Sequence, residues 1–182
     1  SITSLYLDHN QLSGNIPSSL ANLNNLNDVL DLSYNQLSGS IPSALGKLTN
    51  LPFLSLEYNQ LSGNIPSTFG DLAKLRSLYL SNNQLSGNIP SSIGNLIYLT
   101  TMILSRNQLS GHIPPELGKL HLSQLYLSFN QLTGHIPPEL GNLRTFIQGD
   151  FQIIDLSNNQ LTGLIPPKLG KLDLFELDLS NN

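Results

Sequence analysis

A tripeptide, Asn-Gln-Leu, recurs along the chain at a nearly constant interval. Seven copies begin at Asn10, Asn35, Asn59, Asn83, Asn107, Asn130 and Asn159, and Asn182 begins an eighth unit. The intervals are 25, 24, 24, 24, 23, 29 and 23 residues, and Gly-x-Ile-Pro begins four residues after each of the seven asparagines. A period of this length is typical of a solenoid, in which each unit buries its apolar face only against its neighbours.

One unit, residues 78–99, indicates how such a coil is built. Leu78-Tyr79-Leu80 alternates apolar and polar residues, as a short half-buried strand does. Asn83 follows where the side chain turns inward, and a buried amide must be hydrogen-bonded. We therefore expect the repeated asparagines to form a hydrogen-bonded ladder along the solenoid. Its members are Asn10, Asn35, Asn59, Asn83, Asn107, Asn130 and Asn159.

The rest of the unit supplies core residues and turns. Gly87 relieves backbone crowding at a turn, and Pro90 fixes an extended turn without using a backbone donor. Residues 91–94 are too few for more than one turn of 3-10 helix. The remaining apolar residues, expected to point to the solenoid axis, are Leu85, Ile89, Ile93, Leu96 and Leu99.

The whole repeat, LxxLxLxxNxLSGxIPxxLGxLxx, closely resembles the plant-specific class of leucine-rich repeats, and the resemblance covers the entire chain. It implies an α/β-type repeat solenoid that is mostly β, wound as a right-handed superhelix with a parallel β-sheet on its concave side. It also implies short 3-10 turns on the convex side and a second short strand at Gly-x-Ile-Pro. The class includes receptor-kinase ectodomains, receptor-like proteins and polygalacturonase inhibitors, so it implies an extracellular or cell-surface location.

Arrays of this class usually carry disulfide-bonded caps, but this chain has no cysteine and starts and stops within the repeat pattern. Uncapped ends expose apolar coil faces. We therefore expect residues 1–182 to form a single leucine-rich-repeat array of about seven repeats, an uncapped fragment of a longer protein. No Asn-x-Ser/Thr glycosylation acceptor is present, which weighs against a glycosylated extracellular protein.

Composition argues against several classes of partner. Only 11% of the residues are charged, the net charge is −4, and no basic run occurs, so we do not expect nucleic acid to bind. No apolar stretch approaches the roughly 20 residues that span a bilayer, so we expect no membrane contact by this segment. Without cysteine, a thiolate metal site is impossible.

The repeat is interrupted most strongly at residues 144–150, where five extra residues enter before residues 151–154. Insertions in solenoids often contact a partner. The alternative is a tolerated bulge, because lengthening a surface loop costs little free energy. Smaller changes are one extra residue near Asp28 and one missing residue near both His121 and Asp173.

A binding surface is expected on the concave side. Core leucines alternate inward along each strand, so the residues between and beside them face solvent and form columns from coil to coil. The column after the second core residue is mostly serine, which indicates repeat filler, and Asp155, Glu176 and Asp178 make the far end acidic. The alternative is an unspecialised β face. The candidate binding residues are Tyr6, Asp8, Asp31, Tyr34, Phe53, Glu57, Tyr58, Tyr79, Arg106, Tyr126 and Phe129.

Catalysis and metal binding find little support. The acid pairs Asp31 with Asp155 and Asp155 with Asp178 lie on an open ribbon, without the enclosed pocket that shifts a pKa. His112 and His135 hold equivalent positions in adjacent units and are expected to stack outside the coil, but no further metal ligands accompany them. We expect no enzyme activity, no metal and no cofactor.

Three functions remain. The leading hypothesis is a non-catalytic recognition module that binds a protein or peptide ligand on its concave face, as part of a plant receptor-like kinase or receptor-like protein does. The second is an inhibitor of a cell-wall enzyme, of the polygalacturonase-inhibitor kind. The third is an ice-binding or structural repeat protein. Repeated Ser and Asn favour this third reading, whereas the absence of regular Thr-x-Thr columns weighs against it.

Overall fold

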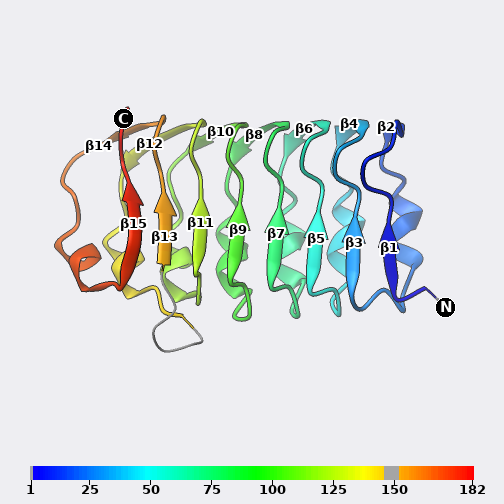
Figure 1. The fold of residues 1–182 in the computed structure, drawn as a ribbon, viewed down its shortest axis with the longest axis horizontal. Coiled ribbons are helices and arrows are strands. Elements are labelled where there is room, and N and C mark those ends of the chain that lie inside the picture. The colour runs from blue at the N-terminus through cyan, green and yellow to red at the C-terminus, as the bar shows by residue number, and fades with distance from the viewer. Residues whose placement is uncertain (1, 146–151) are drawn as a thin grey trace.

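The computed structural model describes residues 2–145 and 152–182 of the chain. The coils lie side by side in one row, with parallel strands along the front of the row in Figure 1. Each coil contributes a strand to a first sheet, a strand to a second sheet and a short 3-10 helix, so the expected leucine-rich-repeat solenoid is confirmed. Arg144 and Thr145 of the insertion are described, whereas residues 146–150 lie outside the described residues.

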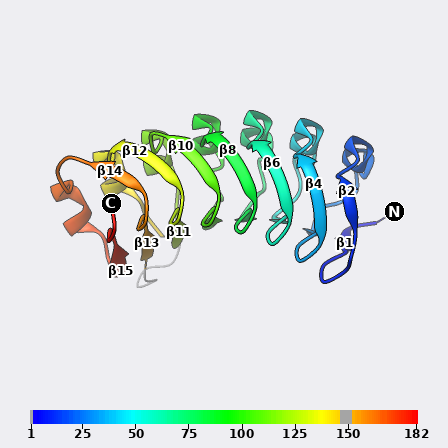
Figure 2. The same ribbon diagram turned by 90° about the horizontal axis from the view of Figure 1, so that it is seen from above.

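The first sheet lines the concave side of the row, as the view from above shows (Figure 2). Its eight strands follow one another in chain order and pair in parallel. Equivalent core residues stand opposite one another, for example Leu54, Leu78 and Met102. The strands are β1 (Ser4–Tyr6), β3 (Val29–Asp31), β5 (Phe53–Ser55), β7 (Ser77–Tyr79), β9 (Thr101–Ile103), β11 (Gln124–Tyr126), β13 (Gln152–Asp155) and β15 (Leu174–Asp178).

The second sheet is formed by the Asn-Gln-Leu and Gly-x-Ile-Pro segments, as the family resemblance implied. Five of the seven strands end directly before an Ile-Pro pair, and β10 and β14 end one and two residues earlier; proline cannot donate to the ladder. Its seven strands are β2 (Ser13–Asn15), β4 (Gln36–Ser40), β6 (Gln60–Asn64), β8 (Gln84–Asn88), β10 (Gln108–Gly111), β12 (Gln131–His135) and β14 (Gln160–Thr162).

In the described residues, seven 3-10 helices cover the convex side (Figure 2). Each one begins directly after the proline of Gly-x-Ile-Pro, whose carbonyl accepts the first helical hydrogen bond; in one coil the Ile93 amide donates to Pro90 at 3.1 Å. The helices are η1 (Ser18–Asn22), η2 (Ser43–Lys47), η3 (Ser67–Asp71), η4 (Ser91–Asn95), η5 (Pro115–Lys119), η6 (Pro138–Asn142) and η7 (Pro167–Lys171).

The core is one continuous column of leucine and isoleucine between the sheets and the helices. Leu78, Leu85, Ile93 and Leu99 of the unit described above are fully buried. Each buried side chain of this size contributes about 1.5–3 kcal/mol, and the contribution depends on the next coil covering it. Phe69 replaces the usual leucine or isoleucine in η3 and is also fully buried.

Two glycines of each unit have different structural roles. Gly87 has φ +71°, a conformation that residues with a Cβ adopt at a cost, and a Cβ there would also collide with the Asn64 side chain of the preceding coil. Gly94 has ordinary φ, but its Cβ would lie 2.5 Å from the Cβ of Glu116 in the next 3-10 helix. The second glycine therefore sets how closely neighbouring helices pack.

The coil containing the insertion departs from the regular pairing. The register between β13 and β15 shifts at Gln152 and Ile153, which indicates a bulge. Gln152 is buried, and its side-chain amide donates to the Leu122 carbonyl at 2.9 Å. This hydrogen bond satisfies a polar group inside the apolar core and ties the irregular coil to its neighbour.

Candidate functional site on the concave sheet

Two columns of outward-facing side chains run across the concave sheet. In each strand they flank the buried residue, and the register places them opposite one another with strands about 4.8 Å apart. The first column is Ser4, Val29, Phe53, Ser77, Thr101, Gln124, Ile153 and Glu176. The second is Tyr6, Asp31, Ser55, Tyr79, Ile103, Tyr126, Asp155 and Asp178.

The middle of the sheet is apolar and aromatic. We call Val29, Phe53, Tyr79, Ile103 and Tyr126, one from each of β3 to β11, the apolar centre; all five are half-buried. The rings of Phe53 and Tyr79 are 5.3 Å apart and tilted by 38°. Burial raises the pKa of Tyr126, and the nearby carboxylates of Glu176 and Asp155 raise it further, so its hydroxyl stays protonated.

Carboxylates flank the apolar centre at both ends. The N-terminal acids are Asp8, Asp31 and Glu57, and the C-terminal acids are Asp155, Glu176 and Asp178. Several are held by hydrogen bonds: Glu57 accepts one from the Ser81 hydroxyl at 2.8 Å, and Asp155 accepts one from the Ser157 hydroxyl at 2.7 Å.

Asp178 shows how such bonds favour the charged carboxylate. Its side chain accepts a hydrogen bond from the Ser180 backbone amide at 2.9 Å, which lowers the pKa of Asp178. Asp31 and Asp155 each accept the same bond from the amide two residues on, at 3.0 Å. These carboxylates are therefore oriented by the backbone of their own coil before any ligand arrives.

The serine column corrects one expectation from the sequence. It was expected to face the concave solvent as repeat filler, but Ser33, Ser81, Ser128 and Ser157 are only 3–4% exposed. The chain already turns toward the second sheet at this position, so a small side chain with a local hydrogen-bond partner fits there. Ser105 and Ser128, for example, lie 3.0 Å apart between their hydroxyl oxygens.

The residue before each ladder asparagine adopts a left-handed backbone conformation. The φ values of these residues lie between 52° and 58°, a conformation that costs about 1–2 kcal/mol for residues other than glycine. The residue types do not predict it, because aromatic residues rarely take this conformation. The residues are His9, Tyr34, Tyr58, Asn82, Arg106, Phe129, Asn158 and Asn181.

The left-handed backbone projects these side chains outward beside the concave sheet, where they contact one another along the solenoid. His9 and Tyr34 stack with ring centroids 4.2 Å apart, and Tyr34 and Tyr58 stack at 4.3 Å. Farther along, the Arg106 guanidinium lies 4.4 Å from the centre of the Phe129 ring. The ring faces within these stacks are therefore already covered, and Tyr34 and Tyr58 remain 40% and 44% exposed.

The asparagines of the ladder make repeated hydrogen bonds. Asn83 donates to the carbonyls of Leu80 and Ser81 in its own coil and of Leu56 in the preceding coil, at 3.2, 3.2 and 2.9 Å. Its side-chain oxygen accepts from the Leu61 amide of the preceding coil at 2.9 Å. Asn35, Asn59, Asn107, Asn130, Asn159 and Asn182 repeat this set, whereas the side chain of Asn10 bonds only within its own coil.

The two equivalent histidines lie on the outside of the second sheet. The ring of His112 lies against Gly134 of the next coil and is 3.1 Å from the Thr133 carbonyl; His135 is 3.2 Å from the Thr162 carbonyl. Among residues 2–145 and 152–182, no group of three or more His, Asp or Glu side chains could hold a metal ion. No helix in the same described part is long and apolar enough to cross a membrane.

The structure groups the sequence-derived candidates into two sets. Phe53, Tyr79 and Tyr126 join the apolar centre, and Tyr34, Tyr58 and Phe129 belong to the left-handed column instead. Val29 and Ile103 complete the apolar centre but were not chosen from the sequence. Both are apolar residues at outward strand positions, so the alternation along each strand predicts that they lie on the concave face.

Comparison with known families gives matches along most of the chain. The leucine-rich-repeat family matches residues 1–61, 28–85 and 73–132, and a second leucine-rich-repeat family description matches residues 150–172. Among curated proteins, no sequence matches significantly.

Solved structures of plant receptors are similar to this chain. The plant peptide hormone receptor RGFR1, solved in complex with RGF2, is 39% identical with a TM-score of 0.94, over 100% of this chain and 28% of that one. The Arabidopsis receptor kinase HAESA ectodomain, solved with an IDA peptide hormone, is 40% identical with a TM-score of 0.86, over 96% of this chain and 28% of that one. This chain thus spans less than a third of either receptor chain.

A structure of another kind is also similar. A plant ice-binding protein is 32% identical with a TM-score of 0.79, over 100% of this chain and 65% of that one. The family matches, the sequence repeat and the two parallel sheets all indicate a leucine-rich-repeat solenoid. The chain is a member of the leucine-rich-repeat family, of the plant type found in receptor-kinase ectodomains.

Proposed function

We propose that the chain is a non-catalytic recognition module that binds an extended peptide, or an extended segment of a protein, across its concave sheet. The observation that carries the proposal is the apolar centre, with carboxylates at both ends of the sheet. Partly exposed aromatic side chains at the centre of a surface, surrounded by polar groups, are typical of interface hot spots. The similarity to peptide-hormone receptor ectodomains supports the same reading.

The charges indicate what kind of peptide fits. Six acids lie toward the two ends of the concave sheet, whereas Arg106 is the one basic residue among the candidate binding residues. A ligand with Lys or Arg toward its ends and apolar residues in its middle would complement this pattern, and long-range attraction would speed its association. An acidic peptide would be repelled.

The proposal also covers the partner, the location and the binding residues. The partner is a free peptide or a protein, and an inhibitor that covers a cell-wall enzyme would use the same concave residues. The location is extracellular, as for the receptor ectodomains that the chain is similar to. The binding residues are Tyr6, Asp8, Asp31, Tyr34, Phe53, Glu57, Tyr58, Tyr79, Arg106, Tyr126 and Phe129, to which we add Val29 and Ile103.

A display selection tests the proposal. A library of random linear peptides would be selected on the purified chain, and the enriched peptides would be assayed against Tyr79→Ala and Asp155→Lys. We expect apolar residues flanked by Lys or Arg, with binding at least about tenfold weaker to Tyr79→Ala, as for a hot-spot residue. The matched control is Gln84→Ala on the second sheet. Peptides without charge bias, or equal binding to Tyr79→Ala and Gln84→Ala, would contradict the proposal.

A second candidate function is ice binding, which one observation on the second sheet favours. Its outward columns are uncharged and regular: glutamine begins strands β4 to β14, and serine or threonine follows two residues later in each. The plant ice-binding protein that is similar to this chain supports the idea. Thermal hysteresis of the purified chain would test it, with Ser62→Lys and Ser86→Lys on this sheet and Ser77→Lys on the concave sheet as the control.

A further inference from the structure

The edge that joins the 3-10 helices to the concave strands is not uniform along the solenoid. In the regular coils the chain makes a tight turn after each helix; the Leu51 amide donates to the Leu48 carbonyl at 2.9 Å, and Leu48 has ψ 55°. The same turn occurs at Leu75 and Leu99, with amide-to-carbonyl distances of 2.8 Å.

This turn is missing after η5, η6 and η7. The leucines that follow these helices, Leu120, Leu143 and Leu172, are extended, with ψ 168°, 144° and 149°. The chain leaves the helix directly there, because two of these units are one residue shorter and the third carries the insertion. Three successive coils therefore leave the edge recessed.

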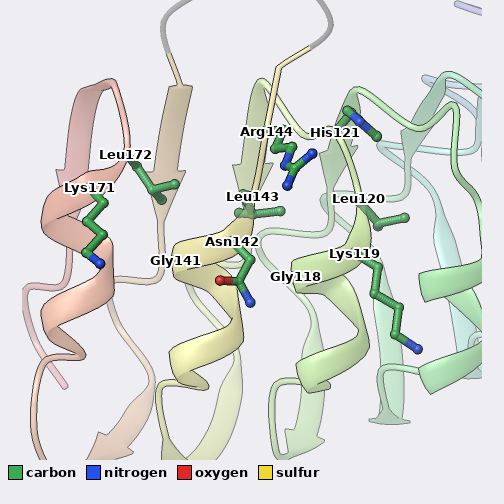
Figure 3. A pocket seen from close by; sticks show the side chains of 10 residues that line it. All are labelled: Gly118, Lys119, Leu120, His121, Gly141, Asn142, Leu143, Arg144, Lys171 and Leu172. Atoms are coloured by element: carbon green, nitrogen blue, oxygen red, sulfur yellow. The ribbon is translucent and has the colours of Figure 1, made fainter.

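The recess is a hollow of about 560 Å³ whose wall is basic (Figure 3). Lys119, Arg144 and Lys171 come from three successive coils, and none of the ten lining residues is acidic. Figure 3 shows Lys119 and Lys171 on opposite sides, with the Asn142 amide between them and Arg144 beside His121. Three of the eight Lys and Arg residues of a chain with net charge −4 thus line one hollow.

No acidic residue lines this hollow beside its three cations; the hollow lined by Lys74 and Arg76 has two cations and also no acid. In the described part of the chain, no carboxylate lies within ion-pair distance of Lys119, Arg144 or Lys171. By contrast, the hollow beside Lys47 is also lined by Asp71, and the ammonium of Lys74 lies 5.4 Å from the centre of the Tyr98 ring. The nearest acid in the sequence, Asp173, does not line the basic hollow.

We propose that this basic hollow binds a small polyvalent oxyanion, a molecule with two or more phosphate or carboxylate groups. Lys119 and Lys171 belong to coils two apart, so their backbones are separated by at least about 10 Å at the usual strand spacing. A single small anion would not reach both, whereas a ligand with two or three charged groups would. Arg144 adds a planar fork that bonds phosphate or carboxylate in a bidentate manner.

Binding of tripolyphosphate to the whole chain at low ionic strength tests the proposal, by calorimetry and by NMR shifts of the Lys119, Arg144 and Lys171 amides. We expect orthophosphate to bind more weakly than tripolyphosphate, because it bears one charged group. Each lysine would contribute one exposed charge pair, so Lys119→Ala and Lys171→Ala should each weaken binding by about 1.4- to fivefold. Citrate, a tricarboxylate, distinguishes the two ligand chemistries: tighter binding of citrate assigns the site to carboxylates.

Lys47→Ala is the matched control, because Lys47 ends a 3-10 helix as Lys119 and Lys171 do but borders a hollow that contains Asp71. All three lysines are exposed, so the variants should fold, which circular dichroism and thermal melting would verify. Affinity that falls in Lys119→Ala and Lys171→Ala but not in Lys47→Ala supports the site. No binding of either polyanion, or equal loss in Lys47→Ala, would overturn it.

Discussion

The two sheets of the solenoid share one backbone repeat but differ in what they present to solvent. On the second sheet nearly every coil shows the same outward residues, glutamine followed by serine or threonine. On the concave sheet the outward residues change from coil to coil, from Asp31 to Tyr79 to Ile103 along one column, with a buried Ser55 between Asp31 and Tyr79. The comparison separates residues that build the array from residues free to specify a partner.

The comparison leads to a simple expectation. Substituting a residue that repeats in every coil and contacts the next one should lower the stability of the array. Substituting a variable concave residue should alter binding and leave stability nearly unchanged. The second sheet tests the boundary between the two classes, because its outward residues repeat and yet are exposed.

The largest loss of stability is expected for Asn83→Ala. The substitution removes four hydrogen bonds and leaves the Leu61 amide without its partner, whereas the Leu56 carbonyl keeps a bond from the Asn59 side chain. An unsatisfied buried polar group costs about 1–3 kcal/mol, so we expect the free energy of unfolding to fall by about 3 kcal/mol. Urea denaturation followed by circular dichroism would measure it.

Asn10→Ala is the control for that substitution. Asn10 is exposed, and its side chain bonds only to the Leu7 and Asp8 carbonyls of its own coil. We expect a loss of less than about 1 kcal/mol. Equal losses in the two variants would mean that bonds between coils contribute little, and the distinction between building and specifying residues would weaken.

The next largest effect is expected for Gly94→Ala. The added Cβ would lie 2.5 Å from the Cβ of Glu116, so the two 3-10 helices would have to separate. Overpacking of this kind costs about 1–3 kcal/mol. At the equivalent Gly170, a Cβ has no heavy atom within 4 Å, so Gly170→Ala should be neutral or slightly stabilising. Thermal melting of both variants would show whether the glycine is required by packing or only by local conformation.

Most of the fold could be predicted from the sequence, because the same strand, turn and core positions recur in each repeat. The period located the strands, and Gly87 and Pro90 marked the turns of one unit that recur in the others. What the single unit could not predict was packing between units. The need for Gly94 comes from Glu116, a residue of the next coil, and the register shift between β13 and β15 leaves Phe175 of the next coil without an opposite residue.

The candidate surface was harder to predict, because side-chain direction changes where a strand ends. Alternation holds within Ser77–Tyr79 and placed Tyr79 on the concave face. Past the strand it fails: Ser81 is buried, and Asn82 has left-handed φ. Extending the strand period by two residues therefore gave a wrong orientation for the serine column.

A smaller effect on stability is expected for a pair of serine substitutions, one on each sheet. Tyr79→Ser on the concave sheet and Gln84→Ser on the second sheet replace partly exposed and exposed side chains. We expect about 1 kcal/mol or less for Tyr79→Ser, which loses its contact with Phe53, and no measurable change for Gln84→Ser. Chemical denaturation would compare them. A loss in Gln84→Ser as large as in Asn83→Ala would show that the second-sheet glutamines also build the array.

The smallest effect concerns the ionisation of Tyr126, which links the apolar centre to the C-terminal acids. Its pKa is raised above the ordinary value of 10.0, first by burial and then by Glu176 and Asp155. A raised pKa means that the neutral hydroxyl favours the folded state; this contribution is complete below the unfolded pKa and is lost as the pH rises through the folded pKa. Tyr126→Phe should therefore lessen the loss of stability in alkali.

An absorbance titration of the tyrosines would measure the same coupling directly. Glu176→Gln should lower the pKa of Tyr126, whereas Glu139→Gln, on the convex side in η6, should leave it unchanged. Assignment would come from the transition that disappears in Tyr126→Phe. If Glu176→Gln and Glu139→Gln behaved alike, the acids at the C-terminal end would not act on the apolar centre. The apolar centre and its acidic flank would then have to be treated as separate surfaces rather than as one concave recognition face.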